Sequence, residues 1–384
     1  MILIKDAKIF TMEENVLENY DLLLKNGKIE KIEKNIKEKE VDQVIDAAGL
    51  NVYPGLIDAH SHVGIYENSI GWEGSDGNEM SDPITPEVRA IDGINAMDES
   101  IVESNQGGVT TLCVTPGSAN VVGGSCVVFK TVGNCIDDMV IKDKVAMKAA
   151  FGENPKRVYQ DNKIKSRMRT AQLLRELLFK TKEYSKKQAA AKDDESKMPA
   201  FDMKLEAMLP VINKEIPLKI HAHRADDILT ALRIVKEFDL DATLEHVTEG
   251  HLIADKISKA NFPLMVGPTL TAKSKYEVKN LTFKTPGVLQ QAGCKVAIIT
   301  DSPVVPQQYL GLCAGLAVKS GMDEYEALKA ITINPAEILK LDDRIGSIKE
   351  NKDADIVITD GNILDSRTNI LYTIVDGEVT YKKD

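Results

Sequence analysis

Hydrophobic and polar residues alternate at both ends of the chain, in the period-two pattern of β-strands. The alternating segments are short and lie at residues 2–4, 8–10, 21–24 and 28–32, and again at 354–358, 370–375 and 378–381. Asn26-Gly27 and Asp376-Gly377 each separate two such segments, which is a strong signal for a β-hairpin. We therefore predict that residues 1–53 and 345–384 together form one small composite β-sandwich domain.

The pattern changes between these ends to apolar strands that alternate with helices. Apolar strand candidates lie at residues 109–114, 145–151, 218–221, 244–246, 263–266 and 296–300. Residues 225–238 place Ile228, Leu229, Leu232 and Val235 at helical spacing. Such alternation is typical of parallel βα units, and about eight of them close a barrel. The expected fold is thus α/β, with a (β/α)8 TIM-like barrel over residues 54–344.

Residues 156–215 differ from the rest of the barrel region because they are rich in Lys and Arg. We expect a helical insertion over the barrel mouth, with a mobile tip. A nucleic-acid role is disfavoured because acidic residues are interspersed and no aromatic stacking platform is evident. A solvated helical face explains the charges better.

Charge and cysteine content narrow the possible partners and the compartment. The net charge of -11 argues against nucleic acid, which needs a basic face. Five cysteines without a CxxC pair indicate reduced thiols. No apolar run approaches the roughly 20 residues of a membrane span, and the first residues lack a signal peptide. We expect a cytoplasmic homo-oligomer that acts on a small molecule, away from membranes.

All six histidines fall in three places, each after a strand-like run: His60 and His62, His221 and His223, and His246 and His251. The C-terminal ends of parallel barrel strands meet on one face, where active sites collect. His60 and His62 lie on the same side of an extended segment, because strand side chains alternate. This clustering predicts a divalent metal at that face.

Asp301 follows the apolar run 296–300 and is a further candidate. A carboxylate at the end of a buried strand is costly unless it meets a cation or hydrogen-bond donors. Ser302-Pro303 follow, so a helix N-cap is the rival interpretation. With the histidines nearby we favour a metal-bound general base. His251 lies five residues after His246, which disfavours the HExxH helix of a zincin protease.

A family resemblance emerges from these motifs. Residues 55–62, Gly-Leu-Ile-Asp-Ala-His-Ser-His, resemble the opening signature of the amidohydrolase superfamily. Residues 327–336, 346–348 and 352–357 are similar to the stretch in which the last barrel helix of these proteins returns to the composite sheet. The resemblance covers nearly the whole chain and is weakest at 156–215. It is greatest to the imidazolonepropionase-like and prolidase-like branch.

The resemblance implies a set of metal ligands. His60 and His62 match the first-strand ligands, and His221 and His246 match those of the fifth and sixth strands. Asp301 matches the eighth-strand aspartate, which binds metal and takes the proton from the attacking water.

The fourth strand departs from the commonest pattern, in which a carboxylated lysine or a glutamate bridges two metals. The chain offers both Lys148 and Glu153. We prefer Glu153 because it lies nearer the C-terminal end of the strand, and we expect Lys148 to be buried in mid-strand or to face the helices. If neither bridges, the site holds a single ion. The expected cofactor is Zn2+, as one or two ions.

The implied reaction is hydrolysis of a carbon–nitrogen bond in an amide, cyclic amide or dipeptide-like substrate, with Asp301 as general base. His246 or His223 would stabilise the oxyanion. One alternative is a mononuclear deaminase acting on a ring amidine. Another is a catalytically silent scaffold subunit, whose mark would be a lost metal ligand, and none is lost.

Two loops are candidates for substrate binding. Residues 71–79 contain Trp72, and residues 115–124 contain Asn120 among several glycines that allow close approach to a ligand. The alternative is that both loops are ordinary barrel turns without a role in binding. We also assign His223 and His251 to the substrate; for His223 the alternative is a hydrogen bond to nearby backbone.

Overall fold

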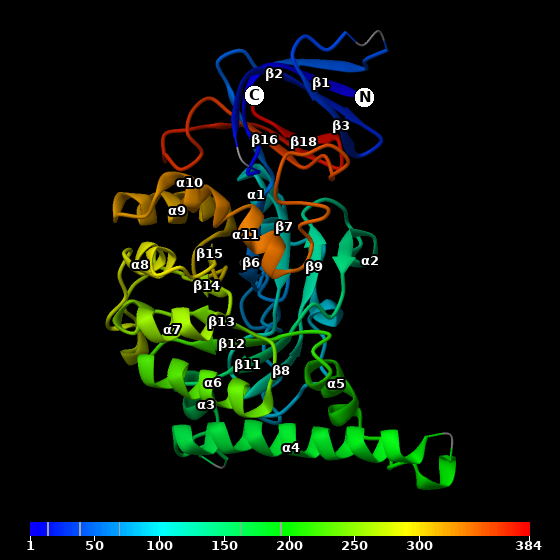
Figure 1. Cartoon of the computed structure of the whole chain (residues 1–384), viewed down its shortest axis with the longest axis vertical. Coiled ribbons are helices and arrows are strands. Elements are labelled where there is room, and N and C mark those ends of the chain that lie inside the picture. Colours follow the sequence, from blue (N-terminus) through cyan, green and yellow to red (C-terminus); the bar gives the residue numbers. More distant parts are fainter. Residues whose placement is uncertain (14, 38–39, 69, 162, 193) are drawn as a thin grey trace.

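Strands from both ends of the chain pair in one sheet at the top of Figure 1. The computed structural model describes residues 1–384 except 14, 38–39, 69, 162 and 193. The strands of this composite sheet are β1 (Ile2–Phe10), β2 (Val16–Lys25), β3 (Lys28–Glu33), β4 (Gln43–Asp46), β5 (Asn51–Pro54), β16 (Ile356–Thr359), β17 (Ile370–Val375) and β18 (Glu378–Lys382). Their order is β18-β17-β16-β5-β1-β2-β3, with β4 beside β1. The hairpins expected at Asn26-Gly27 and Asp376-Gly377 are both present.

The composite sheet has its own apolar core. Ile4, Ile9 and Leu22 from the N-terminal strands pack with Ile356 and Ile374 from the C-terminal strands, and all five are fully buried. Alternate residues of these strands face this core, which explains the period-two pattern of the sequence. Both ends of the chain contribute to this one core, so the two ends fold together.

Among the described residues, eight strands form the barrel, if β8 and β9 are taken together as one. They are β6 (Leu56–Ser61), β7 (Val109–Val114), β8 (Val122–Ser125) continued by β9 (Val127–Lys130), β11 (Met147–Ala150), β12 (Leu218–Ala222), β13 (Ala242–His246), β14 (Leu264–Val266) and β15 (Val296–Ile298). A short β10 (Val140–Lys142) pairs with β9. β6 runs parallel to β7, and β11 to β15 run parallel to one another. The α/β barrel with a composite terminal sheet is thus confirmed.

One strand position departs from the parallel arrangement that the sequence predicted. β9 is antiparallel to β7, and β8 is antiparallel to β11. The connection from Val114 to Val122 is too short for the crossover that parallel strands need, and it contains no helix. The chain therefore reverses direction after β7. The loop between β7 and β8 reaches the face of the barrel where the strand-end histidines lie.

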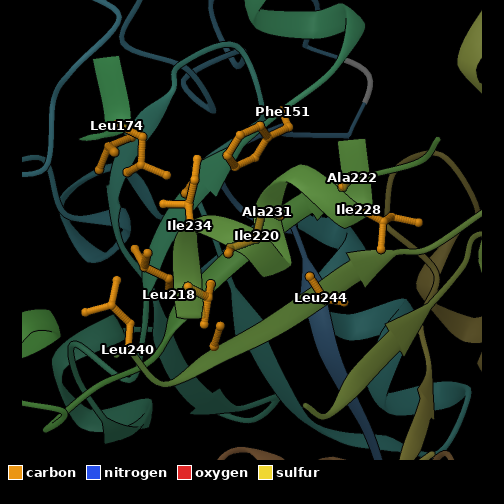
Figure 2. Packing of buried hydrophobic residues seen from close by; sticks show 14 of the residues in the cluster. Phe151, Leu174, Leu218, Ile220, Ala222, Ile228, Ala231, Ile234, Leu240 and Leu244 are labelled. Atoms are coloured by element: carbon orange, nitrogen blue, oxygen red, sulfur yellow. The ribbon is translucent and has the colours of Figure 1, made fainter. Parts of the chain in front are cut away.

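Helices cover the outside of the barrel. Their bounds are α1 (Glu99–Gln106), α2 (Ile136–Met139), α3 (Glu153–Val158), α4 (Arg167–Ala191), α5 (Met203–Ile212), α6 (Ala225–Phe238), α7 (Ala254–Ala260), α8 (Thr285–Gln291), α9 (Leu310–Lys319), α10 (Glu324–Lys329) and α11 (Ile333–Ile338). Figure 2 shows how α6 presents Ile228, Ala231 and Ile234 to strand residues such as Ile220 and Leu244. The helical spacing read from residues 225–238 is therefore a buried face. Among the described residues, no helix combines the length and the apolar character needed to cross a membrane.

The long helix α4 lies along the outside of the barrel, at the bottom of Figure 1. Its Leu174 and Leu178 are buried in the same core as α6. Lys182 donates to the carbonyl of Phe238 at 2.9 Å, at the end of α6. The segment is helical, as predicted, but α4 packs beside α6 instead of lying over the mouth. Its buried leucines provide the reason, because they need an apolar partner that the mouth does not offer.

Lys130 of β9 joins the barrel to the composite sheet. Its ammonium lies 2.8 Å from Asp353 Oδ2 and 3.1 Å from Asp355 Oδ1, and it also pairs with Asp376. Lys28 and Arg344 contact Asp353 as well, at 2.6 and 2.8 Å. Lys130, Asp353 and Asp355 are buried, so these three charges are desolvated, whereas Lys28, Arg344 and Asp376 are partly exposed. It ties together three segments that are far apart in the sequence.

Candidate metal centre

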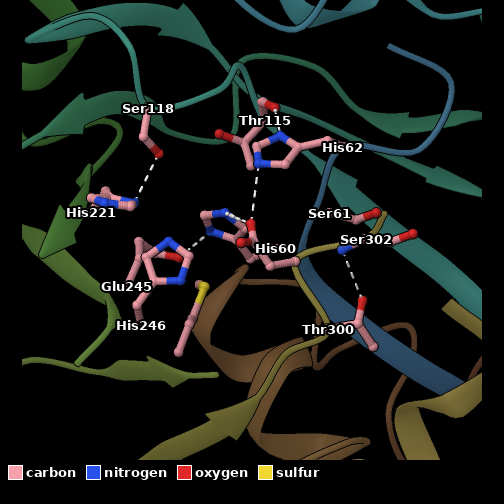
Figure 3. Close-up of polar contacts among 12 residues, drawn as sticks. His60, Ser61, His62, Thr115, Ser118, His221, Glu245, His246, Thr300 and Ser302 are labelled. Carbon is pink, nitrogen blue, oxygen red and sulfur yellow. Dashed lines mark hydrogen bonds and ion pairs between the residues drawn. The ribbon is translucent and has the colours of Figure 1, made fainter. Parts of the chain in front are cut away.

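The first cluster of candidate ligands lies where β6 and β15 end (Figure 3). His60 belongs to β6, His62 follows it directly, and Asp301 follows β15. Asp301 Oδ1 lies 3.2 Å from the Nε2 atoms of both histidines. The three side chains form a group that is able to hold a metal ion, as the sequence predicted for these positions.

The second cluster is made by His221, His223 and His246, at the ends of β12 and β13. One ligand atom from each lies within 4.8 Å of the others. The His221 and His246 rings are 4.3 Å apart, and His246 lies 5.0 Å from His60 of the first cluster. Five of the six histidines therefore meet on one face of the barrel.

Each of these five imidazoles is held from outside through Nδ1. The partners are Glu245 for His60 (2.7 Å), the Thr115 carbonyl for His62 (2.6 Å), Ser118 for His221 (2.8 Å), Thr248 for His223 (2.7 Å) and the Gly267 carbonyl for His246 (2.8 Å). Such outer hydrogen bonds orient metal-binding histidines and leave Nε2 facing the ion. Among the described residues, the buried Nε2 atoms of His221 and His246 have no hydrogen-bond partner. Unpaired buried nitrogens of this kind fit a divalent cation.

Burial also sets the protonation of the cluster. It lowers the pKa of His60, His221 and His223, and it lowers the pKa of His246 to about 3. The imidazoles are therefore neutral near pH 7, with free lone pairs, which is the form that binds metal. Burial alone would raise the pKa of Asp301, but the electrostatic interaction with His246 and the side-chain hydrogen bonds with His60 and His62 hold it well below its usual value. The group thus combines neutral nitrogens with one carboxylate, a donor set suited to zinc.

The structure brings Lys148 to the histidines and leaves Glu153 outside. Lys148 Nζ is fully buried and lies 3.3 Å from His60 Nε2, and burial lowers the pKa of Lys148 to about 8. Glu153 starts α3, where its Oε2 accepts from the backbone N–H of Glu277 at 3.4 Å, and it belongs to neither cluster. Of the two candidates for the fourth strand, Lys148 is therefore the one that the structure places beside the histidines. β11 ends at Ala150, and Gly152 turns the chain with φ +89°. Glu153 therefore lies beyond the end of the strand, at the start of α3.

A buried charge chain behind His60 was missed by sequence reasoning. Glu245 accepts from His60 Nδ1, and it pairs with Lys219 Nζ at 2.9 Å and accepts from Thr243 Oγ1 at 2.6 Å. Lys219 also donates to the carbonyl of Ala59 at 2.8 Å. Both charged side chains are at most 1% exposed. The signal that could have pointed to them is one Lys or Glu inside each of two buried strands.

Asp58 ties the first and last barrel strands together behind the site. Its carboxylate accepts from the backbone N–H and hydroxyl of Thr300 at 3.0 and 2.7 Å, and from Gln307 at 2.7 Å.

His246 and Asp301 both have positive φ, 69° and 54°. Strained backbone of this kind is characteristic of functional sites.

Glu277 is a second unforeseen carboxylate at the cluster. Its Oε1 lies 3.6 Å from His223 Nε2 and 3.7 Å from His221 Nε2, and Lys275 faces it at 2.5 Å. Its Oε2 accepts from the backbone N–H of Glu153 at 2.8 Å. No strand-end pattern in the sequence marks this position, because Glu277 lies in a short turn after β14.

A cavity of about 620 Å³ opens above the histidines. His62, His221, His223 and Asp301 line it, together with side chains from the loops. The three other residues assigned to substrate lie outside this lining. Trp72 is 88% exposed, Asn120 is buried where it donates to Glu79 and Thr85, and His251 contacts Thr285. Among the four, only His223 faces the cavity.

An α/β barrel with neutral imidazoles and a carboxylate at its strand ends carries side chains that could hold a divalent cation. Residues 51–380 match the amidohydrolase family, and the chain belongs to that family. The solved structure of an amidohydrolase from Thermotoga maritima MSB8 is 40% identical, with a TM-score of 0.96 over 100% of both chains. Family membership agrees with the resemblance predicted from residues 55–62.

Other relatives agree with the predicted branch. Imidazolonepropionase from Thermoplasma volcanium is 26% identical over 94% of this chain and 88% of its own length. Amidohydrolase tasK from Hapsidospora irregularis is 27% identical over 94% of this chain, which spans only 40% of that relative. A Xaa-Pro dipeptidase structure, 17% identical with a TM-score of 0.61 and covering 100% of both chains, shares the fold. The imidazolonepropionase likeness thus agrees with the predicted branch, and the dipeptidase structure shows the shared fold alone.

Proposed function

We propose that this protein hydrolyses a carbon–nitrogen bond in a small amide, cyclic amide or dipeptide-like molecule. The observation that carries this proposal is the set of five imidazoles fixed through Nδ1, with Nε2 facing inward beside Asp301. Neutral nitrogens gathered without protons have little purpose in a buried site unless they meet a cation. Membership of the amidohydrolase family supports the same reaction.

His60, His62 and Asp301 would hold one divalent cation, and His221 and His246 a second. We propose Lys148 as the residue between the two groups, in place of Glu153. When bound, such a cation supplies Lewis acidity, which makes water more acidic and polarises the scissile carbonyl. Zn2+ fits this donor set of histidine nitrogens and carboxylate oxygen.

This chain's own groups provide the acid–base chemistry. Asp301 lines the cavity beside His62, so its carboxylate is placed to take a proton from the attacking water and pass it to the departing nitrogen. His223 presents Nε2 toward the cavity because Thr248 holds its Nδ1. We therefore assign His223 to substrate contact.

The test combines elemental analysis with a substrate screen. Purified protein, reconstituted with zinc or manganese, is assayed against N-acyl amino acids, dipeptides, hydantoins and imidazolones. Asp301→Asn is expected to abolish turnover, whereas Asp360→Asn, an exposed change in the composite sheet region, keeps it. Asp301→Asn with near-full turnover and metal still bound would contradict the mechanism. A reconstituted wild type inactive on every compound would sink the proposal.

Deamination of a ring amidine is the second candidate. An adenine deaminase from Methanosphaera stadtmanae is 41% identical over 75 residues, which cover 20% of this chain and 13% of that protein. Release of ammonia by protein that binds one metal per chain distinguishes this reaction from amide hydrolysis.

A further inference from the structure

Tyr66 stands on the cavity wall next to the first metal cluster. It lines the same cavity as His62 and Asp301, and its ring lies edge-on to the His62 imidazole at 5.7 Å. Its backbone N–H donates to the His62 carbonyl at 3.0 Å, which fixes its position relative to the metal ligand. No role has so far been given to this phenol.

The direction of the hydrogen bond at Tyr66 follows from its neighbours. The backbone N–H of Ala119 donates to Asn78 Oδ1 at 2.9 Å, so the amide oxygen of Asn78 must face Ala119. The amide nitrogen then faces the phenol, and an NH2 group only donates. The Tyr66 oxygen is therefore the acceptor, and its own proton points elsewhere. Among the described residues, no hydrogen bond in which the phenol donates is found.

Two glycines allow this arrangement. A Cβ on Gly77 would lie 2.2 Å from the Tyr66 ring, and a Cβ on Gly117 would lie 2.3 Å from the Asn78 amide. The loops that carry them also meet directly, because Gly117 N–H donates to the Gly77 carbonyl at 2.6 Å. These are the loops in which the sequence suggested close approach to a ligand. In the structure, Gly77 and Gly117 instead allow the two loops to pack closely against Tyr66 and Asn78.

A purely structural tether is the rival explanation for this pair. A tether works with either partner donating, and it needs no surface on the cavity. Here the phenol is held as an acceptor, at a cavity wall, with a donor to spare. A tyrosine phenol has an ordinary pKa of about 10, so the donor proton is present at neutral pH.

We propose that Tyr66 donates a hydrogen bond to the substrate oxygen on which negative charge develops, and that Asn78 positions it. This inference rests on the proposed hydrolysis, and it adds a donor to the oxyanion role first given to His246 or His223. No covalent bond to the phenol forms or breaks, and the proton stays on Tyr66. Fixed donors of this type act most strongly where charge appears only in the transition state.

Kinetics of the zinc-reconstituted full chain test the proposal. Tyr66→Phe removes one oxygen, and we expect kcat to fall about 10²–10³-fold with little change in KM, zinc content or Tm. Asn78→Asp keeps the acceptor for Ala119 but accepts the phenol's hydrogen bond, which turns that donor away from the substrate, so a similar fall is expected. The double variant should be no slower than Tyr66→Phe, because both changes remove the same donor. Tyr20→Phe, in the composite sheet, is the control that keeps full activity.

Binding of inorganic phosphate, a tetrahedral oxyanion, gives a readout without a substrate. Calorimetry should show a Kd about tenfold weaker in Tyr66→Phe, as expected for one lost hydrogen bond to a charged group. Unchanged phosphate affinity, unchanged kcat, or losses that multiply in the double variant would overturn the inference while leaving the hydrolysis proposal intact. Weakened phosphate binding in a protein without any hydrolytic activity would uphold the donor and refute the hydrolysis. Wild-type protein with neither property would overturn both.

Discussion

The buried Glu245 gives the sharpest test of how the metal centre is held. Glu245→Gln keeps the shape of the side chain but removes its charge. In the wild type the carboxylate serves His60, Lys219 and Thr243, at 2.7, 2.9 and 2.6 Å. Glutamine offers one oxygen where three donors converge. Lys219 is then left as a buried cation without a counter-charge.

Two effects of different size follow from this loss. Removing one partner of a buried ion pair costs about 3–5 kcal/mol of the free energy of unfolding. Loss of an outer hydrogen bond to a metal-binding histidine weakens metal affinity about 10–100-fold. Burial alone would raise the pKa of Glu245, but Lys219 and His60 hold it below the ordinary 4.5. Its contribution to stability is therefore present above pH 4.5 and is lost as the pH falls toward the lower folded-state pKa.

A second substitution separates the two effects. Lys219→Met in the Glu245→Gln background removes the unpaired cation, so urea unfolding of the metal-free protein should recover part of the lost stability. Zinc affinity, measured by competition with a chelator, should stay weak because His60 still lacks its carboxylate. A Glu245→Gln protein with wild-type zinc affinity would refute the reasoning. A double variant that regains tight zinc binding would refute it as well.

Other changes test the remaining parts of the structure. Lys130→Met leaves Asp355 buried without its cation, whereas Asp353 keeps Lys28 and Arg344, so urea unfolding should show a loss of about 3–5 kcal/mol with zinc content unchanged; wild-type stability would contradict the role given to Lys130. Lys148→Met should lower the zinc bound per chain in elemental analysis, which full occupancy would disprove. Gly117→Ala should displace Asn78 and lower kcat as Tyr66→Phe does, with zinc retained, and an unaffected kcat would argue against the loop contact. Trp72→Ala should leave KM unchanged, because Trp72 lies outside the cavity lining.

The local sequence pattern indicated which residues lie at the ends of the barrel strands. His60, His62 and Asp301 follow apolar runs, and the barrel brings them to one face because strand C-termini point the same way. Lys148 was expected in mid-strand, and it is buried there, yet its side chain reaches His60. Whether a strand residue points into the barrel or toward the helices depends on register with its neighbours, which one strand alone does not fix.

The sequence by itself determined the elements, the pairing of the two ends and the three histidine positions, because these depend on local periodicity and on motifs. Only the tertiary structure decided which charged residues gather behind them. Glu245, Lys219 and Glu277 lie on different segments, and the buried charge of each meets partners from distant parts of the chain. The antiparallel β8–β9 position was likewise settled by a short connection and by the neighbours it pairs with. Contacts between distant segments depend on how the segments pack, and the hydrophobic periodicity of a single segment does not specify that packing.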